Sequence, residues 1–347
     1  MTPKTMKAVV YKKVGGPEVL ELVDVECPKP ICDEVVIRVK ACGLNLLDYY
    51  LRIEDDPDVP MPHILGSDIA GEVVELGEGV RDWEEGDEVI VSPTISCGHC
   101  KYCRNGMDSM CDSRGIIGYQ TQGGYAEYAV VPARNLIKKP KSVTFLEAST
   151  LPLVAVTAYR MVFHQGHLHA GETVLVMGGS SGIGSLAIQL CKVAGAKVIT
   201  TVGFDWKIQK AKEIGADEVI NHSESDWFEQ IQALTGGKGV NLILEHIGGE
   251  FLQKGIELLS QGGRLVTIGS TLGSEIKIDN FQLYRKQASI IGSYMGSISD
   301  LVEVTNLVEM GRVKPVVDKV FTLENVREAH ERLQARKHFG KIVLKLD

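Results

Sequence analysis

The chain has 347 residues, which exceeds the size of one ordinary hydrophobic core and predicts two domains. Its 37 Lys and Arg against 45 Asp and Glu leave a net charge of −8. We therefore expect no nucleic-acid partner, because phosphate binding requires a basic surface. The first residues, MTPKTMKAVVYKKVGGPEV, contain no apolar signal segment, and no stretch approaches transmembrane length. These features predict a cytoplasmic globular protein with no membrane partner.

Short β-branched runs separated by Gly and Pro fill the first 150 residues and predict a β-rich domain. The runs are KAVVYKK, DEVVIRVKAC, IAGEVVEL, DEVIVSP and GYAEYAVVP.

From about residue 153 the chain alternates compact apolar strands with helical patterns such as GSLAIQLCKVAG. The strands are ETVLVM, AKVITTV, DEVINH, NLILEH and GRLVTIG. This alternation predicts βαβ units on a parallel sheet. After about residue 296, ISDLVEVTNLVEMG predicts a helix and KIVLKL a strand. We therefore expect residues 153–295 to form a Rossmann domain inserted into a β-rich domain made of 1–152 and 296–347.

Half of the eight cysteines lie in SCGHCKYCRNGMDSMCD, residues 96–112. Four thiolates at C-x2-C-x2-C-x7-C spacing complete the tetrahedral shell of a zinc ion and leave no position for a substrate. The remaining cysteines are scattered, which favours a metal site over a secreted disulfide framework or free thiols. We expect a structural zinc lobe over about residues 93–113, with His99 as a bystander. Its predicted ligands are Cys97, Cys100, Cys103 and Cys111.

The segment ETVLVMGGSSGIGSLAIQLCKVAG predicts a strand, a glycine-rich turn and a helix. Glycines in such a turn let the backbone approach a pyrophosphate that lies on the helix N-terminus. A glycine-rich turn alone is a weak signal, but the strand before it and the helix after it favour dinucleotide binding. The expected contacts in this turn are Gly179, Ser180, Ser181, Gly182, Ile183 and Gly184.

The second strand, in KVITTVGFDWKIQK, ends at Val202 and Gly203 without the acidic residue that NAD-binding folds place there for the ribose 2′-hydroxyl. Lys207 follows shortly after. A small neutral turn with a nearby cation suits a 2′-phosphate, so we favour NADP(H) over NAD(H), with Gly203 and Lys207 as contacts. Two alternatives stay open: Lys207 is an exposed helix lysine, or Asp205 reaches back to the ribose.

Several spaced motifs together resemble the medium-chain dehydrogenase/reductase superfamily of zinc alcohol dehydrogenases and quinone oxidoreductases. They are LGSDIAGEVVELGEGV and GDEVIV within 65–91, the cysteine cluster, LPLVAVTAYR at 151–160, GGSSGIG, and GKIVL near the end. The resemblance covers nearly the whole chain. It implies an α/β fold, with a GroES-like β-rich catalytic domain and a Rossmann domain built on a doubly wound parallel sheet. It places the active site in the cleft between them.

Zinc-dependent relatives hold a catalytic zinc through a Cys-His pair near the start, a second histidine and a third ligand further on. In this chain Asn45 and Leu46 stand at the positions of the pair, Ser67 replaces the second histidine, and Leu153 stands at the third position. A catalytic zinc typically needs three ligands from Cys, His and carboxylate side chains. We therefore expect no catalytic zinc. Three histidines in FHQGHLHAGE, His164, His167 and His169, offer a counter-candidate, but we expect a solvated loop there.

The segment KACGLNLLDYY, residues 40–50, resembles instead the zinc-independent quinone oxidoreductases. That resemblance implies Asn45, Asp48 and Tyr50 as catalytic candidates. Asn45 could hydrogen-bond the substrate or the cofactor amide, and Tyr50 could donate a hydrogen bond or a proton to a developing oxyanion. Structural roles stay open for Asn45 and Tyr50, and for Asp48 we favour a helix cap.

The resemblance also implies cofactor contacts in the second half of the chain. Thr157 is expected near the nicotinamide, and His222 near the adenosine phosphate, where relatives often carry a tyrosine. QASIIGSYM, residues 287–295, resembles the edge strand through which relatives dimerise, so we expect a homodimer or homotetramer. The further candidate contacts are His246, Ile247, Gly248, Ile268, Gly269, Ser270, Met295 and Lys341.

Without a Lewis acid to polarise an alcohol or ketone oxygen, the simplest reaction left is hydride transfer to an activated acceptor. We expect an NADP(H)-dependent oxidoreductase that acts on a quinone, an enone or another carbonyl substrate, with one structural zinc. Two alternatives stay open: a zinc-containing alcohol dehydrogenase with an unconventional site, and a non-catalytic NADPH-binding protein.

Overall fold

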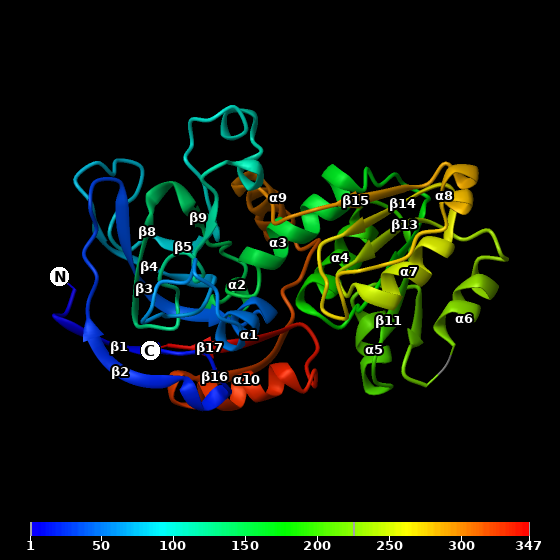
Figure 1. Cartoon of the computed structure of the whole chain (residues 1–347). Helices are drawn as coiled ribbons and strands as arrows, with labels where there is room; N and C mark the ends of the chain where they lie inside the picture. The colour runs from blue at the N-terminus through cyan, green and yellow to red at the C-terminus, as the bar shows by residue number, and fades with distance from the viewer. Residues whose placement is uncertain (1, 225, 347) are drawn as a thin grey trace. The chain divides into compact units, whose positions relative to one another are not determined.

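The computed structural model describes residues 2–224 and 226–346, which form two compact units (Figure 1). Unit 1 comprises the described residues up to Val156, Gly296–Gly311, and the chain from Pro315 onward. Unit 2 comprises Thr157–Met295 and Arg312–Lys314. No helix among the described residues is both long and apolar enough to span a membrane.

Unit 1 is built on a seven-stranded sheet in the order β16-β17-β3-β4-β5-β9, with β8 paired to β3. β3 (Glu34–Gly43) is the centre of this sheet, because its run of β-branched and small residues is buried over most of its length. β17 (Lys341–Lys345) pairs antiparallel with β3, with Leu344 opposite Cys42. The C-terminal segment is therefore an integral part of the first domain's core.

The remaining elements of unit 1 complete this domain. Its other strands in the seven-stranded sheet are β4 (Asp68–Leu76), β5 (Glu88–Val91), β8 (Tyr128–Pro132), β9 (Leu136–Lys138) and β16 (Val317–Thr322). Two small sheets pair β1 (Thr5–Val10) with β2 (Glu21–Glu26) and β6 (Thr94–Ile95) with β7 (Gly115–Ile116). The helices are α1 (Leu46–Ile53), α2 (Phe145–Ala148), α9 (Ile298–Glu309) and α10 (Val326–Gln334), and α3 (Pro152–Tyr159) runs across the boundary between the units. Short 3₁₀ turns are η1 (Pro17–Val19), η2 (Cys103–Asn105), η3 (Asp108–Met110), η4 (Ala133–Asn135) and η6 (Leu323–Asn325).

Unit 2 is a six-stranded parallel sheet in the order β12-β11-β10-β13-β14-β15. The strands are β10 (Thr173–Val176), β11 (Lys197–Val202), β12 (Glu218–Asn221), β13 (Val240–Glu245), β14 (Leu259–Thr267) and β15 (Ser289–Gly292). The helices are α4 (Gly182–Val193), α5 (Trp206–Glu213), α6 (Trp227–Leu234), α7 (Gly249–Glu257) and α8 (Asn280–Lys286), with the π-helix η5 (Arg160–Gln165) before β10. This is the predicted doubly wound Rossmann sheet.

The strand order of unit 2 reverses between β10 and β13, which are neighbours in space although β11 and β12 separate them in sequence. In open parallel sheets, ligands bind outside the carboxyl ends of the strands at such a switch point. The glycine-rich turn follows β10 and therefore lies at this edge. β15 forms one side edge of the sheet, and the predicted homodimer or homotetramer stays a prediction.

Two details differ from the sequence-based expectations. The predicted strand GYAEYAVVP begins only at Tyr128, because the backbone before it turns to pair with other segments: Tyr125 bonds Leu65 and Val9. His164 does not lie in a loop, since η5 extends the preceding helix to Gln165, although its side chain is exposed as predicted.

Candidate functional site

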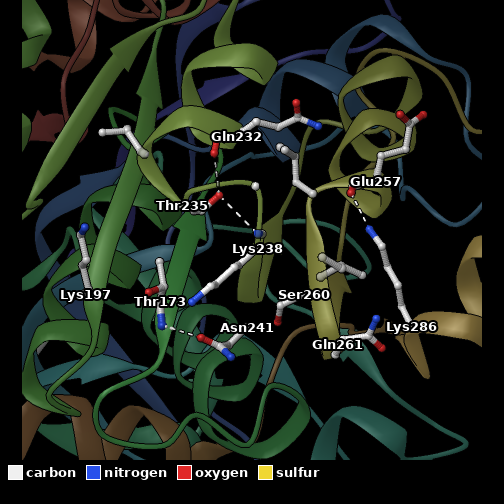
Figure 2. A pocket seen from close by; sticks show the side chains of 15 residues that line it. Thr173, Lys197, Gln232, Thr235, Lys238, Asn241, Glu257, Ser260, Gln261 and Lys286 are labelled. Carbon is white, nitrogen blue, oxygen red and sulfur yellow. Dashed lines mark hydrogen bonds between the residues drawn. The ribbon is translucent and has the colours of Figure 1, made fainter.

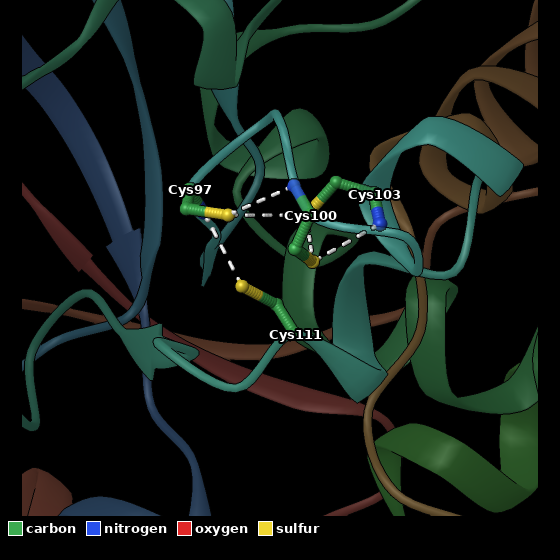
Figure 3. A group of neighbouring side chains, drawn as sticks. All are labelled: Cys97, Cys100, Cys103 and Cys111. Atoms are coloured by element: carbon green, nitrogen blue, oxygen red, sulfur yellow. Dashed lines mark hydrogen bonds between the residues drawn. The ribbon is translucent and has the colours of Figure 1, made fainter.

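The four predicted cysteine ligands converge in one lobe of unit 1 (Figure 3). Their sulfur atoms all lie within 4.8 Å of one another. The Sγ–Sγ distances are 3.9 Å between Cys97 and Cys103 and 3.5 Å between Cys100 and Cys103. A tetrahedral zinc with Zn–S bonds of about 2.3 Å separates its sulfurs by roughly 3.8 Å. The donor set therefore fits a closed zinc site with four thiolate ligands.

Backbone N–H groups around the cluster favour the thiolate forms of Cys97 and Cys100. The Cys100 amide donates to Cys97 Sγ at 3.4 Å, and the Cys103 amide donates to Cys100 Sγ at 3.5 Å. Backbone N–H groups of His99 and Cys100 lower the pKa of Cys97 to about 6. His99 is exposed and its ring contacts the Cys97 carbonyl, so it is not among the converging ligands.

The lobe is anchored to the first turn of α9 by Asp108 and Ser297. Ser297 Oγ donates to the Gly106 carbonyl at 2.6 Å and accepts from the Asp108 amide at 3.1 Å. The Asp108 carboxylate in turn accepts from Ser96 Oγ at 3.0 Å and lies 3.6 Å from the guanidinium of Arg134. A zinc ion bound here would brace this lobe against α9 and would leave no coordination position for a substrate.

A buried ion pair between Lys341 and Asp68 holds Asn45, which stands at one of the expected catalytic-zinc positions. Lys341 is 5% exposed and Asp68 is fully buried. Lys341 Nζ lies 2.6 Å from Asp68 Oδ2, 2.6 Å from Asn45 Oδ1 and 2.5 Å from the Leu44 carbonyl. The three hydrogens of the ammonium thus face three acceptors. Lys341 therefore lies in this cluster, and its predicted contact with the cofactor stays a prediction.

The side chain of Asn45 forms hydrogen bonds with both members of this ion pair. Its Nδ2 donates to Asp68 Oδ2 at 2.9 Å while its Oδ1 accepts from Lys341. The other oxygen of Asp68 accepts from the Leu153 amide at 2.7 Å. The side chain of Asn45 is therefore held in a fixed orientation, which also gives it the structural role left open above.

Asp48 lies one turn further along α1 and is fully buried. Its carboxylate accepts from the Asn45 amide at 2.7 Å, the Gly66 amide at 3.2 Å and Tyr125 Oη at 3.0 Å. Burial raises the pKa of Asp48 to about 6, against the backbone donors that lower it. Burial, together with the Asp48 charge, also raises the pKa of Tyr125. Asp48 thus caps α1 at its N-terminus, as the sequence favours.

The other residues at the expected catalytic-zinc positions supply no metal donor set. Within residues 2–224 and 226–346 the four lobe cysteines are the one group of three or more Cys, His, Asp or Glu ligands that converge. Ser67 is fully buried, and Leu153 contributes only its backbone amide to Asp68. Tyr50, the third catalytic candidate, is half-buried, and its ring packs 5.3 Å from that of Tyr49.

In unit 2 the glycine-rich turn has the geometry of a dinucleotide-binding loop. Gly178 has a φ of +66°, and a Cβ on Gly179 would lie 2.1 Å from Thr200 Oγ1, so both positions require glycine. Ser181 caps α4, because its Oγ accepts from the Gly184 amide at 2.9 Å. The N-terminus of α4 therefore opens at the turn, as a pyrophosphate site requires.

Lys207 is 3% exposed and lies next to this turn. Its Nζ donates to Ser180 Oγ at 3.1 Å, which excludes the alternative of an exposed helix lysine. Asp205 accepts from Asn221 Nδ2 at 2.8 Å. His222 lies beyond Gly203, where a Cβ on that glycine would be 3.4 Å from Nε2. Burial and the Lys207 charge lower the pKa of His222. The Lys207 ammonium, the Ser180 hydroxyl and the His222 imidazole therefore lie close to the carboxyl end of β11.

Two loops at the carboxyl edge are held by Glu245, which ends β13 and is fully buried. Its Oε1 accepts from the amides of Ile247 and Gly248 at 2.5 and 2.7 Å, and its Oε2 accepts from Thr267 Oγ1 at 2.9 Å. The predicted contacts His246, Ile247, Gly248, Ile268, Gly269 and Ser270 all lie on these two loops. His246 also bonds Ser181 Oγ at 3.0 Å, which links one loop to the glycine-rich turn.

The last two predicted cofactor contacts, Thr157 and Met295, do not lie on the loops after β13 and β14. Thr157 is buried at the start of unit 2, and Met295 is buried at the opposite limit of that unit with a φ of +48°. Sequence reasoning missed the structural roles of three residues. Asp68 pairs with Lys341, Tyr125 donates to Asp48, and Glu245 holds the two loops. Only Glu245 carried a local signal, as an acidic residue at the end of the apolar strand NLILE.

A cavity of about 700 Å³ lies at the opposite, amino-terminal edge of the unit 2 sheet (Figure 2). Thr173, Lys197 and Asn241 line it from the starts of three strands. Lys286 Nζ donates to the carbonyl of Glu257 at the end of α7 at 2.7 Å. Because helix C-termini carry partial negative charge, this lysine stabilises the end of α7. The cavity is distinct from the carboxyl-edge loops.

Comparisons with known proteins agree with this geometry. Residues 32–141 match a family model described as an alcohol dehydrogenase GroES-like domain, and residues 182–310 match one described as a zinc-binding dehydrogenase. An NAD-dependent alcohol dehydrogenase of Sulfurisphaera tokodaii is 34% identical, over 98% of this chain and 99% of the relative. A quinone oxidoreductase of Homo sapiens is 33% identical, over 99% and 98%. The crystal structure of an NAD-dependent alcohol dehydrogenase is 41% identical, covers 99% of this chain and 100% of that chain, and has a TM-score of 0.94.

The lobe of four cysteines predicts about one tightly bound zinc per chain. Cys103→Ser should lower the zinc content to a small fraction of that value and lower Tm, because one ligand is lost and the lobe is no longer braced. Elemental analysis of dialysed protein and thermal unfolding measure both effects. Cys32→Ser, an exposed cysteine outside the lobe, is the matched control. A zinc content near two in the wild type would contradict the single-site assignment.

The Lys341–Asp68 pair predicts strong coupling between two residues far apart in sequence. Lys341→Met should lower the free energy of unfolding by about 3–5 kcal/mol, because it leaves Asp68 buried without its cation. The double variant Lys341→Met, Asp68→Asn should recover a large part of this loss, and denaturant unfolding of the four proteins gives the coupling energy. Lys345→Met, at an exposed position on the same strand, should have little effect. Additive losses in the double variant would show that the pair is not coupled.

Proposed function

Because this chain belongs to the medium-chain dehydrogenase/reductase superfamily of oxidoreductases, we propose that it transfers hydride between NADP(H) and a quinone, an enone or a related carbonyl compound without a catalytic zinc. The observation that carries this proposal is the cluster around Lys341. At the positions expected for metal ligands, Asn45 bonds the Lys341–Asp68 ion pair, and Ser67 and Leu153 offer no thiolate, imidazole or carboxylate.

The substrate class follows from the charge that develops during hydride transfer. When bound, the reduced nicotinamide supplies the hydride. As the C–H bond forms on a simple ketone, a full negative charge builds on one oxygen and calls for a Lewis acid. In a quinone or an enone, the hydride adds to a conjugated position and the electron pair spreads to the carbonyl oxygen through the conjugated system. Hydrogen-bond donors then suffice to stabilise the charge.

Tyr50 is the candidate donor for that oxygen. It lies on α1 two residues after Asp48, and Asp48 and the Asn45 amide fix the start of this helix. A phenol held on such a helix can donate a hydrogen bond to the oxyanion and then its proton. Asn45 would act through its fixed amide group, whose orientation the ion pair sets.

The cofactor is a nicotinamide dinucleotide, and Lys207 supports the phosphorylated form. The buried ammonium of Lys207 lies shortly after β11 and donates to Ser180 of the glycine-rich turn. A cation at this place suits a 2′-phosphate. Asp205, which could otherwise accept from a ribose hydroxyl, is bonded to Asn221. Several of the similar proteins are named NAD-dependent, and that observation favours NAD(H) instead. Direct measurement must therefore compare both cofactors.

A second candidate function is alcohol oxidation, because several similar proteins are named alcohol dehydrogenases. It would require either a second zinc or another means of stabilising an alkoxide.

Steady-state assays with a quinone, 2-cyclohexenone, cyclohexanone and primary alcohols separate the two candidates. We expect reduction of the quinone or the enone, with kcat/KM at least about 100-fold above that for the saturated ketone, since one missing oxyanion stabiliser costs about that factor. Tyr50→Phe should lower kcat by about 100-fold, at the lower end of the range of about 10²- to 10⁴-fold for one general acid. Tyr49→Phe, its neighbour on α1, is the control. Chelator-sensitive oxidation of alcohols with no enone reduction would contradict the proposal.

Lys207→Ala tests the cofactor preference. Loss of a charge-assisted hydrogen bond of about 1.5–3 kcal/mol should raise the Kd for NADPH by about 10- to 100-fold and leave the Kd for NADH nearly unchanged. Fluorescence titration of both reduced cofactors measures the two constants. Lys210→Ala, on the same helix, is the matched control. Tighter binding of NADH than NADPH by the wild type, with equal losses for both in Lys207→Ala, would overturn the preference.

A further inference from the structure

Arg160 is a buried cation with no partner. Its side chain is 8% exposed, and its Nε is buried without a hydrogen-bond acceptor. Five Lys and Arg side chains are buried in the part of the chain that the structure describes. Four of them have partners: Lys341 pairs with Asp68, Lys207 bonds Ser180, Lys139 lies 3.3 Å from Glu88, and Arg52 donates to the Gly15 carbonyl. Arg160 alone has neither an ion pair nor a hydrogen bond among the described residues.

An unpaired guanidinium at such a depth is unfavourable for folding alone. A buried N–H without a hydrogen-bond acceptor carries a desolvation cost, and an apolar side chain of similar size would avoid it. Arg160 is also the first residue of the π-helix η5, an irregular helix type that is frequent at functional sites. Both features point to a group that Arg160 meets only when a ligand is bound.

The direction of η5 shows which edge of the sheet Arg160 faces. Just after η5 ends, Gly166 lies near the start of β13: a Cβ on this glycine would be 3.0 Å from Leu242 Cδ2. Its carbonyl accepts from Arg264 Nε of β14 at 2.6 Å. η5 therefore ends toward the amino edge, and Arg160, at its opposite end, lies toward the carboxyl edge.

The carboxyl edge is where the glycine-rich turn lies. η5 packs against α4, the helix that begins at this turn, and against β14. Arg160 also follows Thr157 by three residues, so the two side chains share one helical face. The N-terminus of α4 carries partial positive charge that attracts the same anions as a guanidinium.

We propose that Arg160 is an anion-binding residue of the dinucleotide site and that its guanidinium pairs with the pyrophosphate of the bound nicotinamide cofactor. This inference rests on the proposed function only in requiring such a cofactor. It assigns the 2′ end of the cofactor to Lys207 and the central pyrophosphate to Arg160. A planar fork of N–H donors matches phosphate oxygens in a bidentate manner, which a lysine does not reproduce.

Arg160→Met separates ligand binding from structure. Because the variant removes a buried N–H that has no acceptor, the ligand-free protein should have a Tm equal to or above that of the wild type. Calorimetric titration with ADP-ribose, which carries the pyrophosphate, should show a Kd raised by about 10- to 100-fold. Titration with 2′-AMP, which lacks the pyrophosphate, should change by less than about 2-fold, since its contacts lie at the 2′ end.

Two further variants complete the test. Arg160→Lys keeps the charge without the fork and should fall between the wild type and Arg160→Met. Lys212→Met, an exposed lysine of α5, controls for general loss of positive charge and should bind ADP-ribose as the wild type does.

Three results would overturn the inference. The first is an unchanged affinity for ADP-ribose in a folded Arg160→Met protein. If the KM of an anionic substrate rises while this affinity stays unchanged, the inference is overturned in the same way. The second is an equal loss for 2′-AMP and ADP-ribose, which would indicate distortion of the whole site. The third is a lower Tm of ligand-free Arg160→Met, because it would show that the guanidinium has a structural partner. Failure of the wild type to bind ADP-ribose at all would reject the dinucleotide function as well, so the two failures are distinguishable.

Discussion

One buried ammonium group, that of Lys341, ties together the parts of unit 1 that surround the candidate catalytic residues. It bonds the start of β4 through Asp68 and the N-terminus of α1 through Asn45 and the Leu44 carbonyl. Asp68 in turn holds the amide of Leu153 in α3. At low effective dielectric these charges interact strongly, so the geometry of one group fixes the others. The Lys341 ammonium and the Asp68 carboxylate thus hold the start of β4, the N-terminus of α1 and the start of α3 in one cluster.

This arrangement changes what Asn45 and Asp48 can contribute to chemistry. Asn45 is oriented by the ion pair, and the buried Asp48 carboxylate accepts three hydrogen bonds, so both side chains have fixed polar partners. A rigid scaffold of this kind suits a reaction whose charge is spread by the substrate itself. Unit 2 has a comparable buried carboxylate: Glu245 accepts hydrogen bonds from two loops and holds them in place.

Local signals allowed much of the fold and half of the site to be predicted from the sequence. The spacing of the four lobe cysteines, the glycine-rich turn and the alternation of strands with helices all lie within short segments, and the structure bears out each of them. The pairing of Asp68 with Lys341 joins residues 273 positions apart, from 341 − 68, and no local pattern encodes it. The burial of Lys207 and Arg160 likewise depends on how helices pack on the sheet, which periodicity does not reveal.

The division of unit 1 into separate sequence segments also has a consequence for synthesis on the ribosome. β3 and Asp68 emerge early, but their partners β17 and Lys341 emerge only after all of unit 2 has been made. Pairings of such long sequence separation form late, because the intervening chain must first be ordered. Until residue 341 leaves the ribosome, Asp68 has no cation to meet and the sheet of unit 1 lacks its neighbour beside β3. The nucleotide-binding unit is therefore the first of the two that the nascent chain can complete.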